Sequence, residues 1–139
     1  MIDARELRIG NIVEPITMSP IMVTGITQQK TVDVIFTLIF VDYGESFLQE
    51  HLNPVELSEE WLIKFGFVCE KYDPNFNRHW DMPRDYDIDD VGISVGVNGD
   101  IEMYMNSGEG WIPVKIKWVH QLQNIYFFVM GKELTIQHL

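Results

Sequence analysis

Cysteine, positive charge and long apolar runs are all scarce in this chain of 139 residues. The one cysteine, Cys69, cannot form an internal disulfide, which excludes a disulfide-stapled secreted scaffold. The longest apolar stretch, residues 34–41, is far shorter than the roughly 20 residues that a membrane-spanning helix needs. Charged residues occur in residues 1–8, where a signal peptide would need apolar ones. These absences predict a cytoplasmic protein that does not enter a membrane.

Charge is unevenly balanced, with 10 Lys and Arg residues against 21 Asp and Glu residues and a net charge of −11 at pH 7. Nonspecific binding to a nucleic-acid backbone needs clustered Lys and Arg, so direct nucleic-acid binding is not expected. The acidic residues concentrate in residues 40–60 and 81–109. Residues 111–139 carry three lysines and one glutamate, too few positive charges for a phosphate-binding surface.

The composition is that of a folded protein, with 46% hydrophobic and 22% charged residues. A fold of this length buries roughly two-thirds of the surface of its unfolded chain, enough for a real core. The order of strand and helix patterns predicts a single α+β domain over residues 1–139. We expect a β-rich subregion at 1–57, followed over 58–139 by a short helix, an acidic loop, a hairpin and a C-terminal helix.

The first 57 residues contain three strand patterns, separated by Gly and Pro and rich in β-branched residues. They cover residues 7–14, 21–26 and 32–41. Strands spaced this closely predict an N-terminal antiparallel sheet or a small SH3-like barrel. The third strand is nearly continuously apolar, so both of its faces are expected to be covered.

The second half begins with a helix signal, in which Ser58 is the expected N-cap and Gly66 supplies the left-handed turn at the end. Alternating apolar residues further on predict a β-hairpin that turns at Asn98-Gly99. The expected elements are a short helix, a strand, an irregular acidic loop, the two hairpin arms and a further strand, at residues 58–65, 67–72, 73–92, 93–97 with 101–105, and 111–115.

The last expected element is an amphipathic helix over residues 118–130, ending at Gly131. Its apolar residues at helical spacing form one continuous stripe. Phe127 and Phe128 lie outside this stripe, among polar residues, so the core does not need them. Either the sheet wraps around a second side of the helix and covers them, or another chain does. We take these two residues as the candidate interface.

The acidic loop resembles a cation-binding loop only in part. Its carboxylates at positions 85, 87 and 89 have the spacing of an EF-hand, but the required glycine is Asp90 and the required glutamate is Gly96. A looser cation site stays a hypothesis, with a solvated acidic loop as the alternative. His79 lies close to Asp81 and could carry a proton, although loop histidines are usually plain solvated side chains.

Other signatures of chemistry are absent from the sequence. The four histidines have no metal-ligand spacing and Cys69 has no Cys-x-x-Cys partner, so no structural zinc site is expected. Cys69 lies in an apolar strand pattern and is expected to be inert core. Nucleophile-elbow, phosphate-loop and dinucleotide motifs are all missing. The sequence therefore predicts no catalytic, cofactor-binding or metal-ligating residue.

Three stretches of the chain carry a resemblance. They are Glu6-Leu7-Arg8-Ile9-Gly10-Asn11-Ile12-Val13, Leu57-Ser58-Glu59-Glu60-Trp61-Leu62-Ile63-Lys64-Phe65-Gly66-Phe67 and Trp118-Val119-His120-Gln121-Leu122-Gln123-Asn124-Ile125-Tyr126-Phe127-Phe128. In this order they resemble a family of short uncharacterised proteins from Bacteroidetes genomes and their phages or prophages. That family has no established activity, so the resemblance implies a bacterial or phage accessory protein and assigns no functional residue.

The sequence leaves three functional hypotheses. The leading one is a non-enzymatic protein that acts through protein–protein contact, with a partner or with itself, at Phe127 and Phe128. The second is an acidic nucleic-acid mimic that occupies the DNA site of a DNA-binding protein, for which the net charge of −11 is mild. The third is a small metal-dependent enzyme that uses His79 and the carboxylates of residues 81–90.

Overall fold

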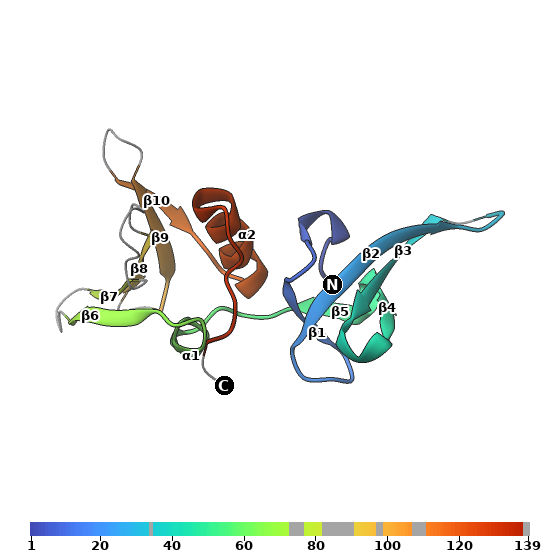
Figure 1. Ribbon diagram of the computed structural model, residues 1–139, viewed down its shortest axis with the longest axis horizontal. Coiled ribbons are helices and arrows are strands. Elements are labelled where there is room, and N and C mark those ends of the chain that lie inside the picture. Colours follow the sequence, from blue (N-terminus) through green and yellow to red (C-terminus); the bar gives the residue numbers. More distant parts are fainter. Residues whose placement is uncertain (34, 73–76, 82–90, 97–98, 107–110, 138–139) are drawn as a thin grey trace. The chain divides into compact units, whose positions relative to one another are not determined.

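The computed structural model describes residues 1–33, 35–72, 77–81, 91–96, 99–106 and 111–137 (Figure 1). The chain forms two compact units. Unit 1 comprises Met1–Glu56 and Trp118–Ile125, and unit 2 comprises Leu57–Lys117 and Tyr126–Leu139. This division shows where contacts within the chain are dense, and it does not test whether the two units fold separately. The single domain expected from the sequence therefore stays a prediction.

Unit 1 is built on a five-stranded antiparallel sheet with the order β4-β3-β2-β1-β5. The strands are β1 (Ile12–Pro15), β2 (Ile21–Lys30), β3 (Ile35–Val41), β4 (Ser46–Leu48) and β5 (Leu52–Pro54). Short 3-10 turns flank them at η1 (Ala4–Glu6), η2 (Asp42–Gly44) and η3 (Gln49–His51). Strands β1 to β4 form a meander, and the 3-10 turn η3 leads from β4 to β5, which pairs with β1. This is the strand order of a small SH3-like barrel.

The core of unit 1 lies on one face of this sheet. At the start of β2, alternate residues are buried, as the two-residue period of a strand predicts, whereas in β1 the consecutive residues Ile12 and Val13 are both buried. On β2 and β3, Val23 and Val41 are opposite each other and both are buried. The buried cluster consists of Ile2, Leu7, Val13, Ile21, Val23, Ile39, Val41 and Leu52. The sequence pattern of the first 57 residues therefore did locate the core-forming strands.

Strands β2 and β3 continue past the rest of their sheet as a two-stranded arm (Figure 1). The second strand is thus longer than the predicted 21–26. The third strand is not covered on both faces, because the side chain of Phe40 is 38% exposed. Phe40 lies over Gly25 on the neighbouring strand, where a Cβ atom would be 3.5 Å from its ring. An aromatic side chain packed over a cross-strand glycine explains an apolar residue on the outer face.

Unit 2 begins with α1 (Glu59–Lys64), which is close to the predicted helix. Ser58 occupies the N-cap position, but its side chain forms no capping hydrogen bond. Gly66 has φ +91°, so it provides the left-handed turn expected from the sequence. Leu62 and Phe65 are fully buried beneath this helix.

The second five-stranded antiparallel sheet belongs to unit 2 and has the order β10-β9-β8-β7-β6. Its strands are β6 (Val68–Tyr72), β7 (Asn77–Asp81), β8 (Val91–Gly96), β9 (Ile101–Asn106) and β10 (Trp111–Lys115). The predicted hairpin is β8 and β9, in which Ile93 is opposite Met103 and both are buried. Asn98 of the predicted turn lies outside the described residues.

Strand β7 corrects the expectation of an irregular loop over 73–92. Its residues 77–81 pair with both β6 and β8. The segment is polar and shows no alternation of apolar residues, so strand periodicity could not reveal it. Residues 73–76 and 82–90 of the predicted loop lie outside the described part of the chain.

The C-terminal helix, α2 (Val119–Met130), agrees with the predicted 118–130. Gly131 follows it with φ +70°, and its N–H donates to the Phe127 carbonyl at 2.9 Å, which closes the last turn. The α+β class and the order of sheet, short helix, hairpin and C-terminal helix are therefore confirmed. Neither helix within the described residues has the length and apolarity that crossing a bilayer requires.

Candidate functional site

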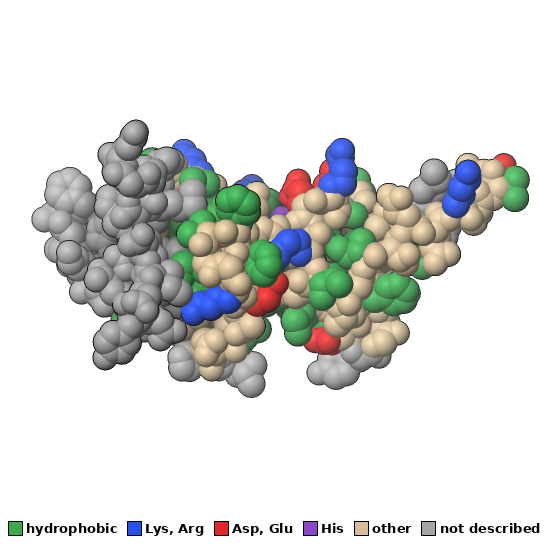
Figure 2. Space-filling view, turned by 45° about the horizontal axis from the view of Figure 1, so that its top comes forward, with side chains coloured by type: hydrophobic (Ala, Val, Ile, Leu, Met, Phe, Trp, Pro, Cys, Tyr) green, Lys and Arg blue, Asp and Glu red, His purple; other side chains and the backbone are tan. Residues whose placement is uncertain are grey.

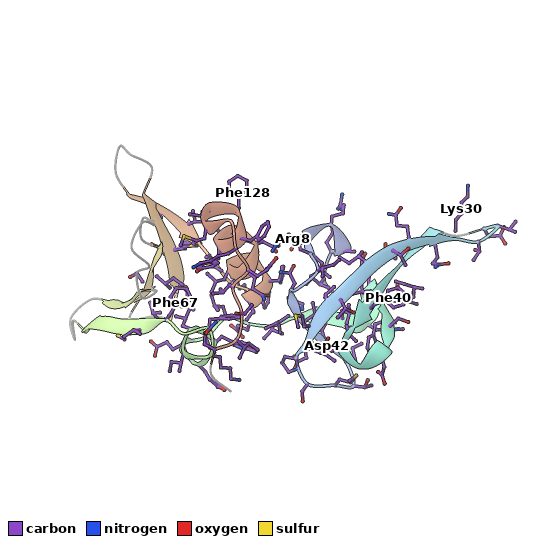
Figure 3. The ribbon with its side chains drawn as sticks, in the orientation of Figure 1. Arg8, Lys30, Phe40, Asp42, Phe67 and Phe128 are labelled. Atoms are coloured by element: carbon purple, nitrogen blue, oxygen red, sulfur yellow. The ribbon has the colours of Figure 1, made fainter. Side chains whose placement is uncertain are left out.

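The candidate interface residues lie in the last turn of α2, in unit 2. Phe127 is 40% exposed and Phe128 is 90% exposed, and the next residue, Val129, is 42% exposed. The neighbouring Tyr126 is buried, with 4% of its surface accessible. The side chain of Phe128 projects outward from the helix (Figure 3). The structure thus places Phe127 and Phe128 together at the surface, and their role in binding stays a prediction.

Hydrophobic side chains are scattered over the face of the molecule shown in Figure 2. The other exposed large apolar residues are separated along the chain. Single examples are Val32, Ile16, Ile9 and Ile63. Scattered apolar residues are normal on protein surfaces. Consecutive helical residues point about 100° apart, so a run of exposed ones surrounds the end of the helix rather than forming one face. Phe127, Phe128 and Val129 are the one run of three consecutive exposed large apolar residues among the side chains described. We call these three residues the helix-end patch.

The side chains on which the acidic-loop hypotheses depend are not among those described. His79 lies in β7, where its backbone is opposite Lys71 and Ser94. Asp81 ends the same strand, opposite Val68 and Gly92. Carboxylates 85, 87, 89 and 90 lie outside the described residues, so the cation site and the proton carrier stay predictions.

The remaining sequence candidates do not meet in one place. His51 is exposed on η3, His120 is buried on α2, and His138 lies outside the described residues. Cys69 is exposed, as is the neighbouring Val68, which corrects the expectation that Cys69 is core: the start of β6 is not covered. Where side chains are described, no three His, Cys, Asp or Glu residues come together as metal ligands would.

A second candidate site was not found from the sequence: a buried polar cluster inside unit 1. It joins Glu6 of η1 and the start of β1 to the first two turns of α2. His120 and Gln123 are each 1% exposed and Asn11 is fully buried. The polar cluster consists of Glu6, Gly10, Asn11, Ile12, His120, Gln123 and Asn124.

Gln123 makes the central contacts of the polar cluster. Its carbonyl oxygen accepts from the backbone N–H of Ile12 at 2.8 Å, and its amide donates to the backbone carbonyl of Gly10 at 3.0 Å. One side chain thus satisfies two backbone groups at the entrance to β1. A buried backbone group without a partner is costly, so this position needs an amide of this length.

Asn11 and Asn124 form the second part of the polar cluster. The Asn11 side chain accepts from the Arg8 backbone N–H at 2.7 Å and donates to Asn124 Oδ1 at 2.9 Å. Asn124 in turn donates to the Glu6 carbonyl at 2.7 Å. The two asparagines therefore fix the segment between η1 and β1 against α2.

The η1 turn that carries Glu6 is itself capped. Asp3 accepts from the backbone N–H of Arg5 at 2.9 Å and from its guanidinium at 2.6 Å. These hydrogen bonds with Arg5 hold the pKa of Asp3 at about 2, below its ordinary value of 3.8. The cap fixes the start of η1, whose last residue, Glu6, begins the polar cluster.

His120 provides the electrostatic feature of the polar cluster. Its Nε2 lies 3.2 Å from Glu6 Oε2, so in the neutral ring the proton is on Nε2, and the Nε2–H donates a hydrogen bond to the carboxylate. Burial lowers the pKa of His120, and this outweighs the hydrogen bond and the charge of Glu6, which raise it. The ring is therefore held in its neutral form at neutral pH.

Helical periodicity assigned His120 to the wrong environment. Positions 120, 121 and 124 lie on the side of the helix opposite to its apolar stripe, which normally faces water. The signal that could have found the cluster is the concentration of amides at the start of the helix together with Asn11 near a β-strand. Two of the stretches that carry the family resemblance, residues 6–13 and 118–128, are the ones joined by the cluster.

Comparisons with known proteins return nothing: no family model, no curated protein and no solved structure matches this chain. Function is therefore inferred from the two sites themselves. The polar cluster is buried and joins parts of unit 1 to one another, so its role is internal. The helix-end patch is exposed, so it is the site that can meet another molecule.

Proposed function

We propose that this protein is a non-enzymatic accessory protein of a bacterium or a phage, acting through protein–protein contact in the cytoplasm. The observation that carries the proposal is the exposure of Phe128, at 90%, within the helix-end patch. Exposing a phenylalanine costs hydration free energy that burial against a partner would recover, about 1.5–3 kcal/mol for a side chain of this size. Aromatic side chains are also the residues most enriched at binding hot spots.

The other parts of the proposal are supported by the sequence. The proposed bacterial or phage origin is supported by the family resemblance of residues 6–13, 57–67 and 118–128. The cytoplasmic location is supported by the lone cysteine, Cys69, which cannot form an internal disulfide. The partner is a protein or a second copy of this chain, because the acidic composition disfavours nucleic acid.

The test is an affinity purification from the native cell lysate, read by mass spectrometry, with the variant Phe127→Asp/Phe128→Asp. The matched control is Ile9→Asp/Val32→Asp, which places the same two charges on apolar residues that are 63% and 99% exposed. Wild type and control are expected to retain the same stoichiometric partner, and the helix-end variant is expected to lose it. Sedimentation of the three proteins applies the same comparison to self-association.

Salt separates this function from the acidic mimic. An apolar interface persists at 1 M salt, whereas contacts between exposed charges are screened within about 3 Å at that concentration. A partner retained at high salt and lost only in the helix-end variant supports the proposal. A partner lost at high salt from all three proteins would instead favour the mimic, and equal capture by all three would exclude the helix-end patch.

A further inference from the structure

The buried ring of His120 has only half of its hydrogen-bonding capacity used. Nε2 contacts Glu6, while Nδ1 is buried and has no hydrogen-bond partner among the described residues. The ring also lies in the first turn of α2, one residue after Val119 begins the helix. A helix N-terminus carries partial positive charge, so this is a poor place for a cation.

Protonation would change the requirements of this ring. The imidazolium has two N–H donors, and Nδ1 would then be a buried donor in need of an acceptor. Glu6 favours the cation, but its side chain is 55% exposed and water screens the attraction. Solvation of the cation is best restored by moving the ring to water.

The charged residues of the segment that packs on the ring are Glu6 and Arg8, and the Nε of Arg8 is buried. Glu6 faces the ring from η1, and Gln123 and Asn124 of its own helix are uncharged. The chain at Val55, whose carbonyl accepts from the Val119 N–H, leads to Glu56, an exposed residue paired with Trp118. Glu6 is the charged group that acts on His120.

We propose that the polar cluster is an acid-released clasp: protonation of buried His120 detaches the segment from Glu6 to Ile12 from the first turns of α2. The hydrogen bonds of Gln123 and Asn124 to Ile12, Gly10 and Glu6 are broken in the released state. The clasp lies within unit 1 and does not depend on the helix-end patch or on its partner.

The direction of the pH dependence follows from the sign of the shift. The pKa of His120 in the folded protein lies below the ordinary value of 6.5, which applies to the released state. The clasp is therefore at full strength above pH 6.5 and weakens as the pH falls toward the folded pKa. Between pH 7.5 and 5.5 the released fraction is expected to rise, by at most about tenfold.

Hydrogen exchange of the full chain measures this release at one atom. The Ile12 N–H donates to Gln123, so its protection factor, corrected for intrinsic exchange, is expected to fall from pH 7.5 to 5.5, by at most about tenfold. In His120→Gln, which cannot be protonated, the factor is expected to stay constant. His51→Gln replaces an exposed histidine of the same unit and is expected to behave as wild type.

Glu6→Gln provides a second test, because it keeps an acceptor oxygen while removing the charge that favours protonation of His120. In this variant the pKa of His120 is expected to fall further, so the protection factor of the Ile12 N–H should keep decreasing to a lower pH than in wild type. If His120→Gln does not fold, the NMR titration of the His120 ring in wild type decides. A midpoint below 6.5 together with falling protection supports the clasp. Constant protection in wild type, or a midpoint at or above 6.5, overturns it.

Discussion

The two ends of α2 reverse the usual relation between polarity and burial. In its first two turns, His120 and Gln123 are polar and 1% exposed. In its last turn, Phe127, Phe128 and Val129 are apolar and at least 40% exposed. If hydrophobicity alone decided burial, the polar residues would be exposed and the apolar ones buried. Another factor must therefore determine which residues of α2 are covered.

The first end is explained by unpaired backbone groups. Where β1 begins, the Ile12 N–H and the Gly10 carbonyl need partners that the sheet does not supply. A glutamine from the helix supplies both, and its burial is then favourable because every one of these groups is satisfied. The last turn has no such demand, and its apolar residues remain exposed. Burial at one end follows hydrogen-bond geometry, while exposure at the other marks the proposed contact site.

The strongest way to break this comparison is Gln123→Met, which keeps the length of the side chain and removes both hydrogen bonds. Two buried backbone groups lose their partner, and each costs about 1–3 kcal/mol. We expect the free energy of unfolding to fall by about 3 kcal/mol, measured by urea denaturation.

The matched control is Gln29→Met, at an exposed position on β2 of the same unit. There the change should be within about 0.5 kcal/mol, because no buried group loses a partner. Equal stability of Gln123→Met and wild type would show that the polar cluster is not held by these bonds.

A double-mutant cycle on Asn11 and Asn124 sharpens the same comparison. Their side chains are bonded at 2.9 Å, and each has a further backbone partner. The replacements Asn11→Ala and Asn124→Ala are expected to be non-additive, with a coupling energy of about 1 kcal/mol. Additive losses, measured by the same urea denaturation, would mean that the two asparagines act separately.

The regular elements of both units could be predicted from the sequence because they depend on local signals. Gly66 and Gly131 end the two helices with positive φ, and glycine adopts this conformation without strain. The arms of the β8–β9 hairpin follow from alternation, since Ile93 and Met103 point into the core. Each of these signals lies within a few residues of the feature that it predicts.

The polar cluster could not be predicted because its partners are distant along the chain. Gln123 bonds to Gly10 and Ile12, which are 113 and 111 residues away. Nothing in the helical period distinguishes a glutamine that serves a backbone from one that faces water. Strand β7 was missed for a related reason, since its polar residues pair through their backbones with β6 and β8.

The smallest expected effect tests the exposed end of α2. Phe128→Ser should change the free energy of unfolding by less than about 0.5 kcal/mol, because serine and phenylalanine have similar helix propensities and little surface is buried. Tyr126→Ala, two residues earlier and 4% exposed, should cost about 3 kcal/mol. Urea denaturation of both variants measures the contrast.

A large loss of stability in Phe128→Ser would mean that this side chain supports the fold, and the proposed contact site would then lose its most exposed member. An unchanged stability leaves Phe128 without a structural role, which is the condition that a residue reserved for contact with another molecule must meet.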